Sequence, residues 1–225
     1  MSFFSFAFQW LGVGAHWHGS AGVPSRVIEH IEYTALAMLI SMVIGLPIGV
    51  AIGHTGRGAL GVIGTVNVWR ALPTLGLLIL AFVLSNGATW AWLVPLVALA
   101  VPPIVVTTYE AVVGVDPALK DAAAGMGMTA WQVLSRVELP VSLPLILVGL
   151  RTAAIQVVST ATIASFISLG GLGRYIIDGL AISDYQEVAA GALLVVVLAL
   201  LVQFAFSGLA RVVVPAGLRK QAGQS

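Results

Sequence analysis

Long stretches without a charged side chain divide this sequence, and they limit its possible folds more than any other feature. Uncharged, mostly apolar residues fill the 24 positions between Glu32 and Arg57 and the 39 positions between Arg70 and Glu110. A helix needs about 20 apolar residues to cross the ~30 Å hydrocarbon core of a membrane. Charged residues make up only 8% of the chain, against about a quarter in soluble domains. The sequence therefore predicts an all-α polytopic membrane protein and excludes a soluble enzyme.

Five membrane-spanning helices are expected from these stretches. The polar sequence Ser85–Thr89 divides the longer one, which is too long for a single crossing. Charged and polar residues mark the ends of the others. The expected spans cover residues 33–56, 60–84, 90–113, 143–168 and 188–214.

Residues 1–27 differ from the expected spans because they are rich in Phe and Trp but interrupted by glycines and Pro24. Aromatic side chains with a polar edge favour the headgroup layer of a membrane. We therefore expect an N-terminal arm at the membrane interface over residues 1–27. The transmembrane domain then covers residues 28–214, and a cytoplasmic tail covers residues 215–225.

The distribution of basic residues predicts the orientation. Cytoplasmic loops of membrane proteins carry an excess of Lys and Arg. With the N-terminus outside, two basic residues outside the spans, Arg26 and Arg174, face the exterior. Six then face the cytoplasm, namely Arg57, Lys120, Arg136, Arg211, Arg219 and Lys220. The loop 114–140 and the C-terminus are therefore expected in the cytoplasm. A net charge of +1 offers no basic surface for a nucleic acid.

Two short helices are predicted within the loop 114–140. Asp116 followed by Pro117 is typical of a helix N-cap with proline at the first helical position. This helix is expected to stop at the glycines 125 and 127. Thr129 and Gln132 have capping-box spacing and start a second helix, which we expect to end before Pro140. Small residues at the turn favour either a docking site for a cytosolic partner or a simple linker between spans.

The residues of this loop resemble the EAA loop of the permease subunits of ABC importers. That loop has the form E-A-A-x-x-x-G, a nine-residue gap, and I-x-L-P. Asp121-Ala122-Ala123, Gly127 and Val137-x-Leu139-Pro140 have the same spacing, with Asp in place of Glu and Val in place of Ile. The segments 125–144, 149–153 and 170–173 look like the osmoprotectant branch, as does Leu72–Leu75. Methionine importers have a similar core and loop and remain an alternative.

The resemblance implies a type I ABC importer permease in a bacterial cytoplasmic membrane. Its loop would dock on a separate ATPase dimer that binds ATP and Mg²⁺, and this chain would bind no cofactor and no metal. A second permease subunit, an extracytoplasmic solute-binding protein and membrane lipid are the other partners implied. The substrates would be glycine betaine, carnitine, choline and proline betaine. The implied ATPase-coupling residues are Asp121, Ala122, Ala123, Gly125, Gly127, Met128, Thr129, Leu139 and Pro140.

Two features of the sequence agree with ATP hydrolysis on a separate subunit. A nucleotide-hydrolysing chain needs a pattern such as G-x-x-x-x-G-K-[ST] to hold the phosphates. The chain has only two lysines, Lys120 and Lys220, and neither follows a glycine. Secondary carriers tend to place acidic residues in their spans, and Glu110 comes nearest to such a position. A self-contained carrier or channel, and a membrane assembly scaffold, remain the alternatives from other classes.

Charged and hydroxyl residues inside the expected spans are candidates for the translocation path or its gate. An Arg at the bilayer centre costs about 2.5–3.5 kcal/mol on insertion scales, so it is expected to face protein or water. Such an Arg either lines the path or bonds to carbonyls freed by a nearby proline. The candidates for the path or gate are Arg70, Pro73, Arg151, Ser159 and Thr162. His16 and His18 lack a third metal ligand, which favours an interfacial role.

Overall fold

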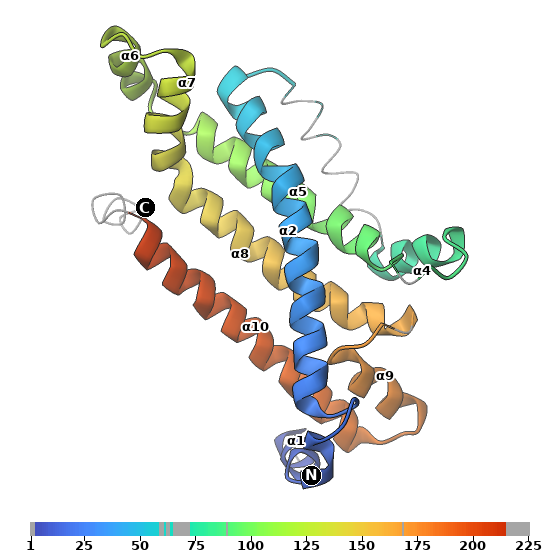
Figure 1. The fold of residues 1–225 in the computed structure, drawn as a ribbon. Coiled ribbons are helices and arrows are strands. Elements are labelled where there is room, and N and C mark those ends of the chain that lie inside the picture. Colours follow the sequence, from blue (N-terminus) through green and yellow to red (C-terminus); the bar gives the residue numbers. More distant parts are fainter. Residues whose placement is uncertain are drawn as a thin grey trace. The chain divides into compact units, whose positions relative to one another are not determined.

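The computed structural model describes residues 3–58, 61, 64, 73–88, 90–167 and 169–214, and it contains helices and no strand within these ranges. Figure 1 shows the ribbon. The helices are α1 (Phe3–Leu11), α2 (Val23–Thr55), α4 (Thr74–Leu84), α5 (Leu93–Val113), α6 (Pro117–Gly125), α7 (Ala130–Val133), α8 (Leu139–Ala164), α9 (Gly173–Ala181) and α10 (Tyr185–Val213). Short 3-10 turns lie at Gly14–Trp17 and Ser165–Ile167, and a π turn lies at Leu134–Glu138. The all-α prediction is confirmed.

Four helical segments in the described residues are long and apolar enough to cross a membrane, namely α2, α5, the continuous segment Ala130–Ile167 and α10. They correspond to the first, third, fourth and fifth expected spans. Helix α4 has 11 residues and is the end of the expected span 60–84. Most of that span lies outside the described residues, so the count of five spans stays a prediction.

Helix α2 begins ten residues before the first uncharged stretch. Its first turns carry Arg26 and Glu29, whose Nη1 and Oε2 atoms form an ion pair at 2.9 Å. A charge-free stretch marks only the part of a helix that suits the hydrocarbon core. The helix itself extends beyond that part, because paired charges near a membrane surface are tolerated.

The expected helix end before Pro140 is wrong. The second helix of the loop continues from Ala130 through the π turn and through Pro140 into α8. Proline lacks an N–H group and clashes with the carbonyl one α-helical turn earlier. A π turn is wider, and the Leu139 N–H bonds the Leu134 carbonyl five residues back. The wider turn accommodates the proline without ending the helix.

The chain packs as two compact units. The first unit comprises Met1–Ile40, Leu72–Ala100 and Ala154–Gln203. The second comprises Ser41–Ala71, Val101–Ala153 and Phe204–Ser225. Each of the four long segments therefore contributes residues to both units.

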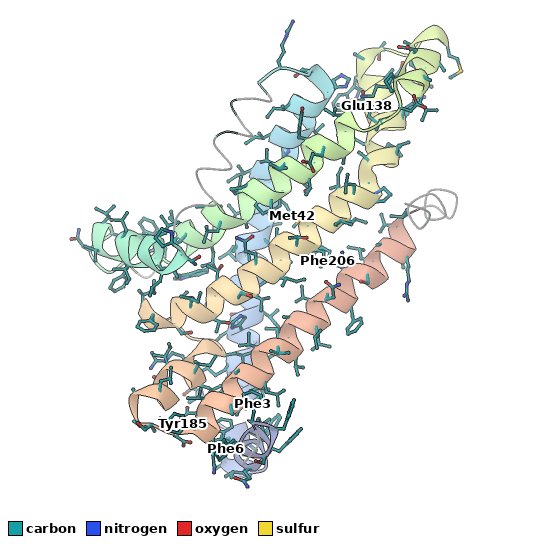
Figure 2. The ribbon with its side chains drawn as sticks, turned by 180° about the vertical axis from the view of Figure 1, so that it is seen from behind. Phe3, Phe6, Met42, Glu138, Tyr185 and Phe206 are labelled. Atoms are coloured by element: carbon teal, nitrogen blue, oxygen red, sulfur yellow. The ribbon has the colours of Figure 1, made fainter. Side chains whose placement is uncertain are left out.

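The first unit has a core built around Trp10. The Trp10 ring stacks on the His16 ring with centroids 3.8 Å apart and meets the Tyr175 ring edge-on at 5.0 Å. The Tyr175 hydroxyl donates a hydrogen bond of 2.7 Å to the Ala21 carbonyl, and burial raises the pKa of Tyr175 to about 12. Val23, Val158, Leu172, Ala190 and Leu198 complete the cluster. The N-terminal aromatic segment is thus anchored to α9 and α10 in this unit. Figure 2 shows Phe3 and Phe6 beside Tyr185.

Three glycines bring α2 and α5 close together in the second unit. Gly45, Gly49 and Gly53 lie four residues apart on α2. A Cβ atom at Gly49 would lie 2.6 Å from the Thr108 Cβ atom, and one at Gly53 would lie 2.7 Å from the Val112 Cβ atom. Small residues at this spacing allow helix backbones in membranes to approach. The three glycines are visible in the sequence, but their spacing was not used to predict this contact.

Candidate functional site

The hairpin of α6 and α7, in the second unit, carries the residues that resemble the EAA loop. The Asp116 Oδ1 atom accepts a 2.9 Å bond from the Ala118 N–H and caps α6. At α7, the Thr129 N–H donates to Gln132 Oε1 at 2.8 Å, and the Gln132 N–H donates to Thr129 Oγ1 at 3.4 Å. The predicted N-cap and capping box are therefore confirmed.

The turn between these helices depends on Gly127, which has φ +84°. The Gly127 N–H bonds the Ala124 carbonyl at 2.9 Å, and the Met128 N–H bonds the Ala123 carbonyl at 3.2 Å. This pair of bonds is the Schellman ending of a helix, which requires a left-handed residue at this position. Glycine adopts that conformation without the steric penalty of a Cβ atom. The glycine of the loop motif is therefore required by the fold of the hairpin itself.

Apolar side chains cover the exposed side of the hairpin. Leu119, Met126 and Trp131 are 47%, 73% and 72% exposed, and we call these three residues the apolar tip. Ala123 is 2% exposed, so it packs inside the hairpin. Sequence reasoning placed weight on the small residues and missed the tip, although a Met and a Trp in a polar loop were a visible signal.

The other predicted coupling residues lie on both sides of this turn. Asp121, Ala122, Gly125 and Thr129 are exposed, and Met128 is half-buried. Leu139 and Pro140 are half-buried in the first turn of α8 rather than at the tip.

A buried carboxylate connects the hairpin to its neighbours. The Glu138 side chain is 3% exposed and lies in the π turn that precedes α8. Its Oε2 atom accepts from His54 Nδ1 of α2 at 2.7 Å, and its Oε1 atom pairs with Lys120 Nζ of α6 at 3.2 Å. Lys120 Nζ also donates to the Val112 carbonyl of α5 at 3.2 Å. Figure 2 labels Glu138 at the base of the hairpin.

Sequence reasoning missed this cluster and singled out Glu110 instead, as the acid nearest to a position inside a span. Glu110 is exposed, and neither it nor Arg151 takes part in an ion pair of the described residues. Glu138 is the x of the Val137-x-Leu139-Pro140 motif. A single acid at the entry to a long apolar segment was the only local signal, and such an acid needs a partner when buried.

The role of the candidates for the translocation path or gate stays a prediction, and the structure describes the local surroundings of some of them. Arg70 lies outside the described residues. Pro73 is exposed and precedes α4. The Ser159 hydroxyl donates to the Ile155 carbonyl and the Thr162 hydroxyl to the Val158 carbonyl, both within α8.

In the first unit, two residues of α2 hold the loop between α8 and α9. Glu29 Oε2 accepts from the Gly171 N–H at 2.8 Å, and His30 Nδ1 accepts from the Leu172 N–H at 3.3 Å. His30 is fully buried, and its other ring nitrogen bonds the Val158 carbonyl at 3.1 Å. This loop leads into α9, which begins at Gly173.

A metal role for His16 and His18 gains no support. His16 Nδ1 bonds the Trp10 carbonyl at 2.8 Å. In the described ranges, no three His, Cys, Asp or Glu residues form a group that could hold a metal ion.

Long apolar helices joined by a capped hairpin define an integral membrane protein with a protruding loop between two of its spans. Residues 33–217 match the family model described as binding-protein-dependent transport system inner membrane component. The chain belongs to this family, so it is a multi-pass inner-membrane transport subunit rather than an enzyme.

Curated relatives cover most of the chain. The glycine betaine/carnitine/choline transport system permease protein OpuCB of Bacillus subtilis (strain 168) is 35% identical over 85% of this chain and 88% of its own length. The choline transport system permease protein OpuBB of the same organism is 33% identical over 87% of this chain and 90% of its own. The osmoprotectant import permease protein OsmW of Salmonella typhimurium is 34% identical over 88% of this chain and 94% of its own length.

Solved structures with the same fold include an ABC transporter. The MetNI methionine ABC transporter, in an inward-facing conformation, has a chain that matches with a TM-score of 0.77 at 25% identity. The match covers 86% of this chain and 96% of that one.

Proposed function

We propose that this chain is the permease subunit of an ATP-driven importer for osmoprotectants that carry a quaternary ammonium group. The substrate class is glycine betaine, carnitine, choline and proline betaine. Relatives named for glycine betaine, carnitine and choline, at 33–35% identity over more than four fifths of the chain, support this class. The mean hydropathy of +1.04 and the four long apolar segments support membrane-spanning helices, which a permease needs to form its translocation path.

The proposed function requires partners, because this chain supplies the path but not the ATPase or the solute-binding protein. A separate ATPase dimer binds ATP and Mg²⁺ and hydrolyses the nucleotide, because this chain lacks the Gly-rich pattern that holds phosphates. A second permease subunit, identical or homologous, completes the path. An extracytoplasmic solute-binding protein delivers the substrate. The hairpin and the C-terminus face the cytoplasm, and the N-terminus faces outward.

The apolar tip is the observation that carries this proposal. Large apolar side chains exposed on a short polar hairpin are typical of a surface that another protein covers. The three residues of the tip, Leu119, Met126 and Trp131, are exposed on the hairpin that carries the small residues of the loop motif. They dock on the ATPase subunit.

The base of the hairpin transmits the motion. The segment Ala130–Ile167 is one continuous helical run through the π turn. A displacement of α7 by the ATPase therefore moves the start of α8 directly. Glu138 carries the same displacement to α2 through His54, because the carboxylate bonds both segments. ATP binding thus alternates the path between outward and inward opening.

A second candidate is an amino-acid importer. The MetNI chain supports it, with a TM-score of 0.77. The permeases named for osmoprotectants share more sequence with this chain, and the identity of 25% to the MetNI chain is lower. Osmoprotectant import is therefore the favoured function. Uptake of methionine but not of choline or glycine betaine by the assembled transporter would reverse this choice.

Replacing Met126 by Glu tests the docking role. The Met126→Glu variant places a charge on the apolar tip at its most exposed residue, so we expect solute uptake to fall by about tenfold or more through loss of an apolar interface contact. Met126→Leu is the matched control because it keeps the apolar contact. The measurement is uptake of choline and glycine betaine into proteoliposomes with the ATPase and the solute-binding protein present, together with co-purification of the ATPase. Normal uptake and co-purification in Met126→Glu would contradict docking through the tip.

A further inference from the structure

Three aromatic rings line one cavity in the first unit. Its volume is about 370 Å³, at the lower end of the ~300–1,000 Å³ range of small-molecule sites. Tyr33, Phe82 and Trp92 supply the rings, and the Tyr33 and Trp92 centroids are 4.9 Å apart with a tilt of 55°. The remaining lining residues are Gly87, Ala88, Ile167, Leu169 and Gly170.

The cavity lies where several helix ends meet. Phe82 is in the last turn of α4, and Trp92 immediately precedes α5. Tyr33 comes from the first third of α2, and Leu169 and Gly170 of the loop before α9 also line the cavity. In the orientation proposed above, this is the outer side, where a solute arrives from its binding protein.

The lining selects a particular kind of cation. No charged side chain is among the lining residues that the structure describes. A primary ammonium brings three N–H groups, and each costs free energy when buried without an acceptor. A trimethylammonium group has no N–H, so it loses no hydrogen bond in such a cavity. Aromatic faces within about 6 Å attract it through the cation–π interaction.

The wall formed by the loop is held in place before any solute arrives. Glu29 and His30 bond the backbone N–H groups of Gly171 and Leu172, next to the lining residue Gly170. A Cβ atom at Gly170 would overlap the Glu29 carboxylate, so this position has room only for glycine. Gly87, which also lines the cavity, has φ +76°, and a Cβ atom there would lie 3.5 Å from the Phe82 ring. A preorganised wall reduces the cost of binding.

We propose that this aromatic cavity is a solute-binding station within the permease itself, which receives the quaternary ammonium group of the substrate on its way into the path. The inference rests on the proposed function for its substrate class. It adds a site in this chain that selects for that group after the binding protein has released it.

Replacing Trp92 by Leu tests the site, because leucine keeps an apolar wall but removes the aromatic face. The probe is radiolabelled choline, taken up by the complete transporter at saturating binding protein. The vesicles contain only phosphatidylethanolamine and phosphatidylglycerol, so no lipid headgroup carries a trimethylammonium group. We expect the maximal uptake rate of Trp92→Leu to fall roughly tenfold. Trp92→Phe, which restores a ring, should recover most of the loss.

Trp90→Leu is the matched control, since Trp90 is exposed and does not line this cavity. Its uptake should stay within about twofold of the wild type. If Trp92→Leu does not assemble with the ATPase, Tyr33→Leu replaces it, with Tyr33→Phe as the ring-retaining partner. Normal choline uptake in the leucine variant, or equal losses in Trp92→Leu and Trp92→Phe, would contradict the solute-binding role of the cavity and leave the proposed function intact. A wild-type transporter that imports no quaternary ammonium solute overturns both.

Discussion

Two loops of this protein are each anchored through a buried or half-buried carboxylate, but in different ways. In the first unit, Glu29 bonds a backbone N–H of the loop before α9, and its side chain is 32% exposed. In the second unit, Glu138 bonds two side chains, His54 and Lys120, and is 3% exposed. The Glu29 contact holds the loop that lines the aromatic cavity. The Glu138 contacts instead join the base of the hairpin to α2 and α6 through a buried carboxylate.

The difference bears on what each loop can do. A carboxylate that accepts from a backbone N–H can be replaced by a neutral acceptor at modest cost, because the N–H is itself neutral. A buried carboxylate beside a lysine balances a charge, and its removal leaves that charge without compensation. The hairpin is therefore far more dependent on its anchor than the loop before α9, and a movement of the hairpin reaches α2 and α8 together.

The largest effect is expected from Glu138→Gln. An uncompensated Lys120 inside the protein should lower the free energy of unfolding by about 3 kcal/mol, the low end of the range for broken buried pairs, because Lys120 is 25% exposed. Thermal unfolding of the purified chain, followed by tryptophan fluorescence, measures this. Glu110→Gln is the control, since Glu110 is exposed and has no ion pair among those of the described residues. Equal losses of unfolding free energy in both variants would show that the buried Glu138 contributes no more to stability than the exposed Glu110.

A smaller effect is expected from Glu29→Gln. The amide oxygen can still accept from the Gly171 N–H, but the ion pair with Arg26 is lost. Because both side chains are partly exposed, the loss should be about 1 kcal/mol. The same unfolding measurement applies, with the exposed Glu32→Gln as the control. A loss as large as that of Glu138→Gln would remove the contrast between the two anchors.

The smallest effect concerns the turn of the hairpin. Gly127→Ala forces a Cβ atom into a left-handed conformation and should cost about 1 kcal/mol or slightly less. Gly125→Ala lies in α6 with open space around it and should instead stabilise the helix by a few tenths of a kcal/mol up to about 1. Opposite signs in thermal unfolding would confirm that the turn geometry explains the motif glycine. A stabilising Gly127→Ala would contradict it.

Local features of the fold were predictable from the sequence to a useful degree. The N-cap at Asp116, the capping box at Thr129 and the glycine turn at Gly127 all depend on residues within one helical turn of each other. Four apolar spans followed from the absence of charge. The prediction failed at Pro140, because a π turn depends on how the following helix packs as well as on the proline.

The candidate site was predictable only in part. The loop motif indicated the family, which the match over residues 33–217 confirmed. A Met and a Trp in the loop were a visible signal of an apolar surface, but their exposure was settled only by the structure, because a pattern of residue types does not say which side of a short hairpin faces outward. The aromatic cavity was also missed, since Tyr33, Phe82 and Trp92 belong to three separate segments.

By itself, the sequence determined the helical class, the long apolar segments, the capped hairpin and the membership of a transport family. These properties depend on composition and on neighbours a few residues apart, where hydrogen bonds and steric limits act directly. Only the tertiary structure decided that Glu138 meets His54, 84 residues away, and that three distant rings enclose one cavity. Such contacts arise from packing between segments, and no spacing along the chain encodes which buried side chains will face each other.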